Sequence, residues 1–466
     1  MRLGILIMAA GKGTRLKSKR AKVLHAIGGR PLVQHVIAAA AQVVPPQDIF
    51  AIVGHQAEAV QTAVRATGIH FIVQAEQRGT GHAIQCAEEA TRDYDELIIL
   101  SGDVPLLRSE TIVALRDFHL REQAAMTILT AAPEIPLGYG RILRKKKDAP
   151  DVAAIVEQKA LTPEQEGIRE INSGIYAFRR AALYGHIGQL RDDNAHKELY
   201  LTDMARILVD AGERVVAIEA AQATEVLGAN TIAEMMDLDR ELRLATARRL
   251  MAAGVTIFMP ETVVIDAGVQ VGPDTVIEPF VQLLGETQIG ADCHIRSYSV
   301  IENTTVGDHV LVRQSCVIAE SDIGKGALIG PFAHLRTGSH IGEGAHIGNF
   351  VETKKIRIGK GSKANHLTYL GDAQIGSGVN IGAGTITCNY DGVDKHETLI
   401  EDGVFIGSDS TLVAPIVIGE GSYVAAGSCI TENVPAEALA LGRARQTTKA
   451  HWAKNRRAQR KSGASK

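Results

Sequence analysis

A glycine-rich turn with two basic side chains follows the first apolar segment of the chain. Residues 8–16 read MAAGKGTRL. Such a turn lets backbone N–H groups approach phosphate oxygens, while lysine and arginine neutralise their charge. The segment is not a Walker loop, because Gly13 follows Lys12. It is not a GxGxxG fingerprint either, because Leu16 takes the place of the third glycine. On its own it predicts only a tight strand-to-helix turn with solvated basic side chains.

Two further polar turns follow apolar runs that are typical of buried strands. Gln74 ends one run, and Gly79 and Thr80 open the helical segment after it. Asp103 ends the next run, ELIILSGD. In open α/β sheets ligands lie beyond the carboxyl ends of strands, and an aspartate there can hold a divalent cation between phosphates. The alternative for Asp103 is a turn or capping residue before a proline.

A second group of polar residues gathers around one histidine of the C-terminal half. The chain has 16 histidines, and a lone one is ordinarily a solvated surface residue. An imidazole has an unperturbed pKa of about 6.5 and suits proton transfer near neutral pH. His366 stands out because polar side chains follow it closely: Tyr369, Asn380, Asn389, Tyr390 and Lys395.

The elements that must position the first group alternate between strands and helices. Apolar runs at 3–8, 49–54, 69–74 and 96–103 alternate with helix-like segments at 31–42, 56–67 and 81–91. This order predicts right-handed crossovers on a mainly parallel, Rossmann-like sheet with both faces covered. We expect an α/β domain over residues 1–229, followed by a long linker helix over 230–253 with Gly254 as its stop.

The second group lies in a region with a short internal repeat. An aliphatic residue followed by glycine recurs from Val271-Gly272 to Ile375-Gly376, with glycine spacings of 18, 17, 17, 18, 17 and 17. Further pairs follow six residues later, which is the pattern of a hexapeptide β-helix. Stacked coils bury a core without large rings, in keeping with only 4% aromatic residues and 46 glycines. We expect this β-helix over residues 254–440.

Composition bounds the remaining possibilities. The 466 residues are 45% hydrophobic and 22% charged, which excludes a mainly disordered chain. The net charge is −3, but residues 441–466 hold nine Lys or Arg and no acidic residue. A nucleic-acid arm is one interpretation of this basic tail, and a solvated, partly disordered end is the one we prefer.

Cysteine usage and hydropathy predict a cytoplasmic protein. The five cysteines are far apart and form no CxxC pair, which fits a reducing compartment. The run LGILIMAA near the N-terminus ends in a charged loop and predicts a buried strand rather than an export signal. We expect no membrane or nucleic-acid partner.

The chain resembles the sugar-nucleotide pyrophosphorylase family. The GKGTR loop, Lys22 and the GDVP strand end are its hallmarks. Further segments are similar to the bifunctional bacterial branch of that family, and the resemblance spans nearly the whole chain: GTGHA at 79–83, YGR at 139–141, IVE at 155–157, EIN at 170–172 and EVLGAN at 225–230.

The resemblance implies two reactions. An acetyl group would pass from acetyl-CoA to glucosamine 1-phosphate, and uridylyl would then pass from UTP to N-acetylglucosamine 1-phosphate with release of pyrophosphate. The product, UDP-N-acetylglucosamine, would supply peptidoglycan and lipopolysaccharide precursors. Magnesium is the implied cofactor, and a left-handed β-helix and a homotrimer with shared acetyl-transfer sites are the implied architecture.

The resemblance also implies the residues of the uridylyl-transfer site. Arg15 and Lys22 would hold phosphates, and Asp103 and Asn230 would bind magnesium. Ser101 stands where the family often has tyrosine. The remaining implied contacts are Ala9, Ala10 and Gly11 to the nucleotide through their backbone, Gln74, Gly79 and Thr80 to uracil, and Gly140, Glu157 and Asn172 to N-acetylglucosamine.

For acetyl transfer, the resemblance implies that His366 is the general base that takes a proton from the glucosamine amine. Asn365 departs from the small glycine that usually precedes this histidine. The sugar phosphate would contact Arg336, Lys354, Tyr369, Asn380 and Lys395. Acetyl-CoA would contact Ala383, Asn389, Tyr390, Ser408, Ala426 and Arg443.

Two other functions remain open at this point. One is a single-activity sugar-nucleotide pyrophosphorylase with a regulatory β-helix, against which the His366 segment argues. The other is a nucleotide-responsive assembly scaffold without turnover, which would bind nucleotide tightly and release no pyrophosphate.

Overall fold

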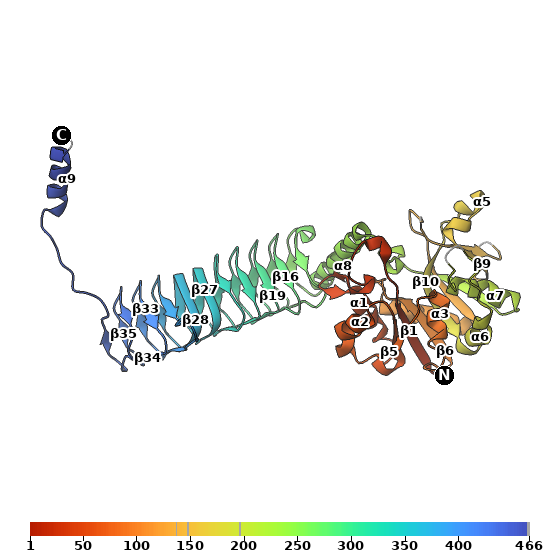
Figure 1. The fold of residues 1–466 in the computed structure, drawn as a ribbon, viewed down its shortest axis with the longest axis horizontal. Helices are drawn as coiled ribbons and strands as arrows, with labels where there is room; N and C mark the ends of the chain where they lie inside the picture. Colours follow the sequence, from red (N-terminus) through yellow and green to blue (C-terminus); the bar gives the residue numbers. More distant parts are fainter. Residues whose placement is uncertain (137, 147–148, 195–196, 464–466) are drawn as a thin grey trace. The chain divides into compact units, whose positions relative to one another are not determined.

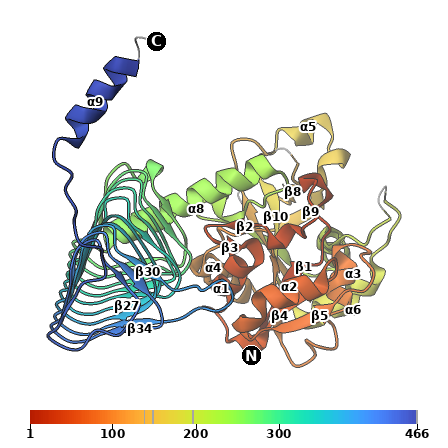
Figure 2. The same cartoon turned by 60° about the vertical axis from the view of Figure 1, so that its left-hand side comes forward.

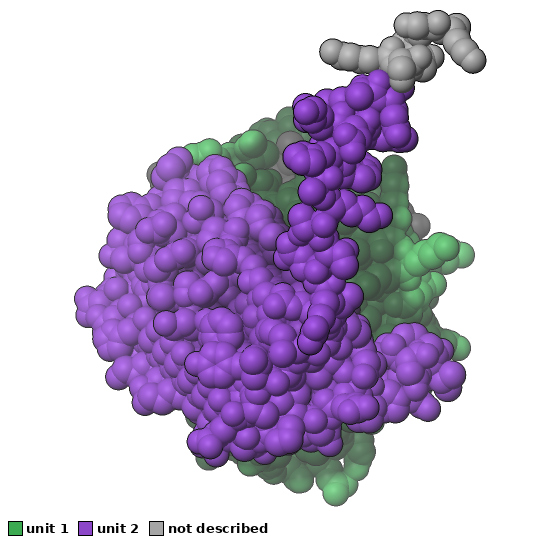
Figure 3. All heavy atoms as spheres, turned by 90° about the vertical axis from the view of Figure 1, so that its left-hand side faces the viewer, with its two compact units in different colours: residues 1–246 green, residues 247–466 purple. Residues whose placement is uncertain are grey.

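The computed structural model describes residues 1–136, 138–146, 149–194 and 197–463. The chain divides into two compact units, residues 1–246 and 247–466 (Figure 3). The first unit contains the predicted α/β fold and the second the predicted parallel β-helix (Figure 1).

A mixed sheet forms the centre of the first unit. Its main path runs in the order β11-β7-β10-β6-β1-β4-β5, and β8 and β9 extend it beside β10. The strands are β1 (Leu3–Ala9), β4 (Ile49–Val53), β5 (His70–Val73), β6 (Glu96–Ser101), β7 (Met126–Ala131), β8 (Arg141–Arg144), β9 (Val152–Val156), β10 (Ile171–Arg179) and β11 (Val215–Glu219).

Helices cover both faces of this sheet, as the apolar runs predict. Along β1, Ile5 and Ile7 pack into one core, whereas Leu6 between them packs into another. This alternation follows the two-residue period of a strand. The first core includes side chains of α1 (Leu32–Ala40), α2 (Ala57–Val64) and α4 (Ser109–Glu122), and the second includes side chains of α3 (Thr80–Gln85), α6 (Arg180–His186) and α7 (Met204–Asp210).

The predicted parallel crossovers do not extend to β8, β9 and β10, which pair in antiparallel fashion. β1 pairs in parallel with both β4 and β6, but β10 lies antiparallel between β6 and β7. β10 continues past the register shift between Asn172 and Ile175, and β8 pairs with its first residue. This end of the sheet therefore carries the EIN and YGR segments side by side.

The helix α8 (Ile232–Ala252) follows the sheet in sequence, and the boundary between the two units falls within it. Gly254 just after it has a φ of +95°, a left-handed conformation that suits a helix stop. The β-helix begins immediately afterwards with β12 (Thr256–Ile257) and continues to β37 (Leu439–Ala440).

Each coil of the β-helix contains three strands, so a strand typically pairs in parallel with the third strand after it (Figure 2). The aliphatic residues of the sequence repeat stack in register, and all but the partly buried Val271 are fully buried. This confirms that one aliphatic residue per repeat points into the core. The column contains Val271, Ile289, Val306, Ile323, Ile341, Ile358 and Ile375.

Two features interrupt the regular coils. The strands β27 (His346–Ile358) and β28 (Lys363–Ile375) are 13 residues long, and they pair along most of their length. The next repeat is longer: Ile358 pairs with Ile375, 17 residues on, but Ile375 pairs with Ile400, 25 residues on. The eight extra residues allow a loop around 389–396, which holds an isolated bridge between Tyr390 and Lys395.

The basic tail contains the helix α9 (Trp452–Gly463), which sequence analysis did not predict. Its side chains are exposed up to Arg460, and the last three residues of the predicted tail lie outside the described residues. All five cysteines are free thiols. Within the described part of the chain, no helix is both long enough and apolar enough to span a membrane.

Candidate active sites

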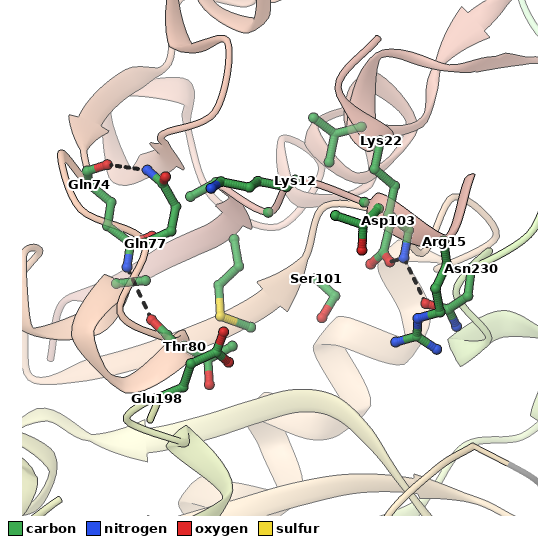
Figure 4. A pocket seen from close by; sticks show the side chains of 18 residues that line it. Lys12, Arg15, Lys22, Gln74, Gln77, Thr80, Ser101, Asp103, Glu198 and Asn230 are labelled. Carbon is green, nitrogen blue, oxygen red and sulfur yellow. Dashed lines mark hydrogen bonds and ion pairs between the residues drawn. The ribbon is translucent and has the colours of Figure 1, made fainter. Parts of the chain in front are cut away.

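A pocket of about 590 Å³ opens at the carboxyl ends of β1, β5 and β6 in the first unit (Figure 4). This is the edge at which the sequence predicts ligand binding. Ten of the predicted residues line it: Ala10, Gly11, Arg15, Lys22, Gln74, Gly79, Thr80, Ser101, Asp103 and Asn230.

At one end of the pocket, an ammonium group lies between two oxygens. Lys22 forms an ion pair with Asp103 and also donates a hydrogen bond to Asn230 Oδ1 at 3.1 Å. Arg15 lies beside this group in Figure 4. A carboxylate oxygen and an amide oxygen therefore converge on one cation, next to the glycine-rich turn.

The turn itself depends on Gly13. Its φ is +61°, and a Cβ at this position would lie 2.6 Å from Lys22 Cβ. A larger residue would therefore be strained in its backbone and would also displace Lys22. The left-handed backbone and the close packing explain why glycine occupies position 13 even though the turn matches neither common phosphate-loop pattern.

At the other end of the pocket, Gln74 and Thr80 are fixed by local hydrogen bonds. Gln74 is almost fully buried, and its side-chain nitrogen donates to the Gly79 carbonyl at 3.1 Å. The hydroxyl of Thr80 accepts a hydrogen bond from the Leu201 N–H at 2.9 Å. The chain before Leu201 packs so closely that a Cβ at Gly79 would lie 2.6 Å from the Leu199 carbonyl oxygen.

Four predicted residues do not line this pocket. Ala9 is buried at the end of β1, and the other three belong to neighbouring segments. The Asn172 N–H donates to the Gly140 carbonyl at 2.9 Å, and the Asn172 side chain donates to the hydroxyl of Tyr176 at 2.9 Å. Glu157 accepts a hydrogen bond from Thr202 at 3.2 Å. Gly140 and Asn172 are thus brought together.

Sequence analysis missed several side chains of this site. Lys12 and Thr14 were part of the motif but received no role, whereas Gln77 and Glu198 had no recognised signal; all four line the pocket. Gln77 donates to the Gln74 carbonyl at 3.0 Å. Burial raises the pKa of the Tyr139 phenol above its usual value.

The second site lies on the long strands of the β-helix. His366 on β28 is exposed, and its Nδ1 lies 2.6 Å from Asn349 Oδ1 on β27. An amide oxygen can only accept, so this contact places the ring proton on Nδ1 and leaves Nε2 as the basic nitrogen. Asn349 had no role in the sequence analysis, although it stands one 17-residue repeat before His366 and pairs with it in register.

Three cations from different coils of the β-helix lie close to one another. The neighbouring Lys395, and then Arg336, hold the pKa of Lys354 below its usual value. Arg336 also forms an ion pair with Glu352 at 2.8 Å. Such a cluster of positive charges is a site for an anion.

The inserted loop that carries Lys395 is held by one carboxylate. Asp391 accepts hydrogen bonds from the N–H groups of Val393 at 2.8 Å and Asp394 at 2.7 Å, and from His396 Nε2 at 2.7 Å. Together these hydrogen bonds hold the pKa of Asp391 far below its usual range, and the bond from His396 has the largest effect. Within the same loop, the Tyr390 hydroxyl donates to the Gly392 carbonyl at 2.6 Å.

Asn389 and Tyr369 lie at the base of this loop. Asn389 donates a hydrogen bond to Asp372. A Cβ at Gly371 would lie 2.5 Å from the Tyr369 hydroxyl oxygen and 3.0 Å from Asn389 Nδ2, so both side chains approach the backbone of Gly371. Asn380 pairs with Lys363 one coil away.

The remaining predicted acetyl-CoA contacts form a ladder across successive coils. The Ala383 carbonyl accepts from the Asp409 N–H at 2.7 Å, and the Ser408 carbonyl accepts from the Gly427 N–H at 2.8 Å. Arg443 Nη1 then donates to the Ala426 carbonyl at 2.7 Å. The coils therefore align Ala383, Ser408, Ala426 and Arg443, which are far apart in sequence.

Comparison with known families separates the same two parts of the chain. A MobA-like NTP transferase domain matches residues 5–201. A GMPPB C-terminal domain matches residues 259–333, and bacterial transferase hexapeptide repeats match residues 320–355 and 397–432. The fold and the sites thus define a nucleotidyltransferase joined to a hexapeptide-repeat transferase.

Full-length relatives identify the family. The bifunctional protein GlmU of Koribacter versatilis is 62% identical over 99% of this chain and 98% of its own length. The GlmU proteins of Solibacter usitatus and Pelobacter propionicus are 50% and 47% identical, over 98% and 96% of this chain and 97% of their own lengths. The chain belongs to the GlmU family of bifunctional proteins. This membership confirms the predicted bifunctional enzyme of UDP-N-acetylglucosamine synthesis, with acetyltransferase and uridylyltransferase activities.

Proposed function

We propose that the two constellations are the two active sites of this bifunctional enzyme. The observation that carries the proposal is their separation: Lys22, Asp103 and Asn230 meet in the first unit, whereas His366 and the cluster of cations around Lys354 lie on the β-helix of the second. Each constellation has the groups that one of the two reactions needs.

For uridylyl transfer, a phosphate oxygen of N-acetylglucosamine 1-phosphate attacks the α-phosphorus of UTP. The bond from this phosphorus to the bridging oxygen breaks, and pyrophosphate leaves. No protein nucleophile is needed, so the chain contributes position and positive charge. Arg15 and Lys22 neutralise the phosphates, and the turn at Ala10 and Gly11 offers its backbone N–H groups.

Asp103 and Asn230 fit a magnesium ion. Their oxygens already converge on one cation, the Lys22 ammonium. No cluster of three or more His, Cys, Asp or Glu residues suited to a metal occurs in the described part of the chain. The protein would therefore supply two oxygen ligands, and phosphates and water the rest. When bound, magnesium neutralises charge on the reacting phosphates.

In the first unit, different residues bind the uracil and the sugar. Gln74, Gly79 and Thr80 bind uracil at the end opposite the cations. Gly140, Glu157 and Asn172 bind the sugar of N-acetylglucosamine 1-phosphate from the neighbouring segments. Ser101 lies between the two ends in Figure 4, where its small side chain leaves room for substrate.

For acetyl transfer, His366 Nε2 takes a proton from the amine of glucosamine 1-phosphate. The freed amine attacks the thioester carbonyl of acetyl-CoA, the carbon–sulfur bond breaks, and coenzyme A leaves as its thiol after proton uptake. Asn349 holds the imidazole in the tautomer that this step requires. Such a general base contributes about 10²- to 10⁴-fold to the rate.

The cations of the second site bind the phosphate of the same substrate. Arg336, Lys354 and Lys395 hold this group, and Tyr369 and Asn380 complete the sugar-phosphate site. Acetyl-CoA lies along the ladder of aligned coils. Its contacts are Ala383, Asn389, Tyr390, Ser408, Ala426 and Arg443.

The proposal extends to assembly and location. The flat faces of the β-helix and its exposed apolar side chains, such as Val317, Ile386 and Phe405, suit packing against further copies of the chain. We therefore assign a homotrimer, with the acetyl-transfer sites shared between chains, acting in the cytoplasm. Light scattering of the purified chain tests the trimer, which a monomeric mass would contradict.

One assay tests the two activities together. The purified chain receives glucosamine 1-phosphate, acetyl-CoA, UTP and magnesium, and the products are followed by mass. We expect N-acetylglucosamine 1-phosphate and then UDP-N-acetylglucosamine. Absence of both products would contradict the proposal, whereas chelation of magnesium should stop only the second step.

A further inference from the structure

One arginine near the sugar site is buried without an acidic partner. Arg141 is 2% exposed and is the largest fully buried side chain in the described residues. A buried charge is costly unless it is paired or fully hydrogen-bonded. Within the described residues Arg141 belongs to no ion pair, and neutral oxygens accept its hydrogen bonds.

The three acceptors lie in three different segments. Arg141 Nε donates to the Ile168 carbonyl at 2.9 Å, and Nη1 donates to the Tyr139 carbonyl. Nη2 donates to Gln158 Oε1 at 3.0 Å. The same Gln158 oxygen accepts a hydrogen bond from the Gly138 N–H at 3.3 Å. One planar guanidinium therefore joins two backbone carbonyls and one side-chain oxygen from three segments.

Each of these segments carries one of the sugar contacts assigned above. Tyr139 directly precedes Gly140, and Gln158 directly follows Glu157. Ile168 lies in the turn before β10, where Ile171 pairs with Arg141 and the next residue, Asn172, donates to the Gly140 carbonyl at 2.9 Å. The guanidinium lies where these three segments meet.

We propose that Arg141 is the positioning residue of the sugar-phosphate site, setting the relative positions of Gly140, Glu157 and Asn172 through the fixed fork of its hydrogen bonds. This inference rests on the proposed function of those three residues. Because the hydrogen-bond partners are neutral, the fixed directions of the guanidinium N–H donors position the segments, and the positive charge does not. A lysine keeps the charge but cannot bind three oxygens in fixed directions.

Two other arginines of the same sheet differ from Arg141 because each pairs with an acidic residue. Arg144, at the other end of β8, donates from Nε to Glu170 Oε2 at 2.8 Å and forms an ordinary ion pair. Arg179, at the far end of β10, pairs with Glu213 at 2.6 Å. Arg179→Met therefore removes a guanidinium from the same sheet without touching the fork, and it serves as the matched control.

The test compares Arg141→Lys and Arg141→Met with that control. Both variants should lower kcat/KM for N-acetylglucosamine 1-phosphate by about 30-fold or more, mainly through KM. The Kd for UTP and the rate of acetyl transfer by the same chains should stay within about threefold of wild type. The control should match wild type in all three measurements.

Several outcomes would overturn the inference. Near-normal activity of Arg141→Lys would show that charge alone suffices, and parallel loss of UTP affinity would show general damage to the domain. If neither Arg141 variant folds, Gln158→Leu decides: a KM raised about fivefold supports the inference, and an unchanged KM overturns it. A wild-type chain that cannot use N-acetylglucosamine 1-phosphate would instead contradict the proposed function.

Discussion

The contact between Asn349 and His366 gives the most informative perturbation of the acetyl-transfer site. Asn349→Ala removes the amide oxygen that lies 2.6 Å from His366 Nδ1 and orients the imidazole, while the base itself stays in place. The variant therefore separates the orientation of the ring from its chemistry.

The size of the effect follows from the hydrogen bond. A bond of this kind contributes about 0.5–1.5 kcal/mol net, and about 1.4 kcal/mol corresponds to tenfold in rate. The contact is exposed to solvent, so we expect a loss of about fivefold in kcat for acetyl transfer. His366→Ala removes the base and should cost about 10²- to 10⁴-fold.

The assay follows coenzyme A release with a thiol reagent, with uridylyl transfer by the same preparation as the internal control. Asn349→Asp adds a second test, because a negative charge beside the ring favours its protonated form. The acid limb of the pH–rate profile should then move to higher pH. Uridylyl transfer should be unchanged in every variant.

The double variant decides whether the two residues act together. If Asn349 acts through His366, then Asn349→Ala should cost nothing more once His366 is alanine. Independent, multiplicative losses would refute the reasoning, as would an Asn349→Ala rate within twofold of wild type with an unchanged pH profile. A His366→Ala rate within tenfold of wild type would remove His366 from the mechanism.

Three further predictions concern single charges. Asp103→Asn should lower uridylyl transfer by roughly 100-fold or more and leave acetyl transfer intact; near-normal uridylyl transfer would refute the metal assignment. Lys395→Met removes the main cause of the lowered pKa of Lys354, so this pKa should rise. The loss of affinity for glucosamine 1-phosphate at alkaline pH should then move to higher pH. An unchanged pH profile of affinity would contradict the cation cluster. Asp391 has a depressed pKa in the folded protein. Its stabilising hydrogen bonds are therefore fully present above the unfolded-state pKa of about 3.9 and are lost as pH falls. His396→Phe should raise the pKa of Asp391 in an NMR titration, and an unchanged pKa would exclude the pairing of the two residues.

The β-helix could be predicted closely from the sequence because its repeat is local and periodic. Each aliphatic residue before a glycine faces the core, and one coil contains 17 or 18 residues, so the buried column could be written down directly. The α/β fold could be assigned by class, since apolar strands and helices alternate. The antiparallel β10 could not, because strand direction in this part depends on pairings between distant segments.

The sites were predictable to different degrees. Residues at strand ends, such as Gln74 and Asp103, follow from the rule that ligands bind at the carboxyl edge of a sheet. Most other roles came from resemblance and not from pattern. Asn349 was missed although the repeat length places it directly beside His366, and this signal could have been used. Arg141 had no such signal, because its burial depends on segments that meet only in the folded chain.

The central claim is that one chain holds two independent active sites, and mixing two inactivated variants tests it most directly. Asp103→Asn and His366→Ala are each incubated with glucosamine 1-phosphate, acetyl-CoA, UTP and magnesium, alone and then together, with products followed by mass. We predict that Asp103→Asn accumulates N-acetylglucosamine 1-phosphate, that His366→Ala leaves glucosamine 1-phosphate unacetylated, and that the mixture restores UDP-N-acetylglucosamine. A mixture that stays inactive, or a single substitution that abolishes both reactions, would contradict the account.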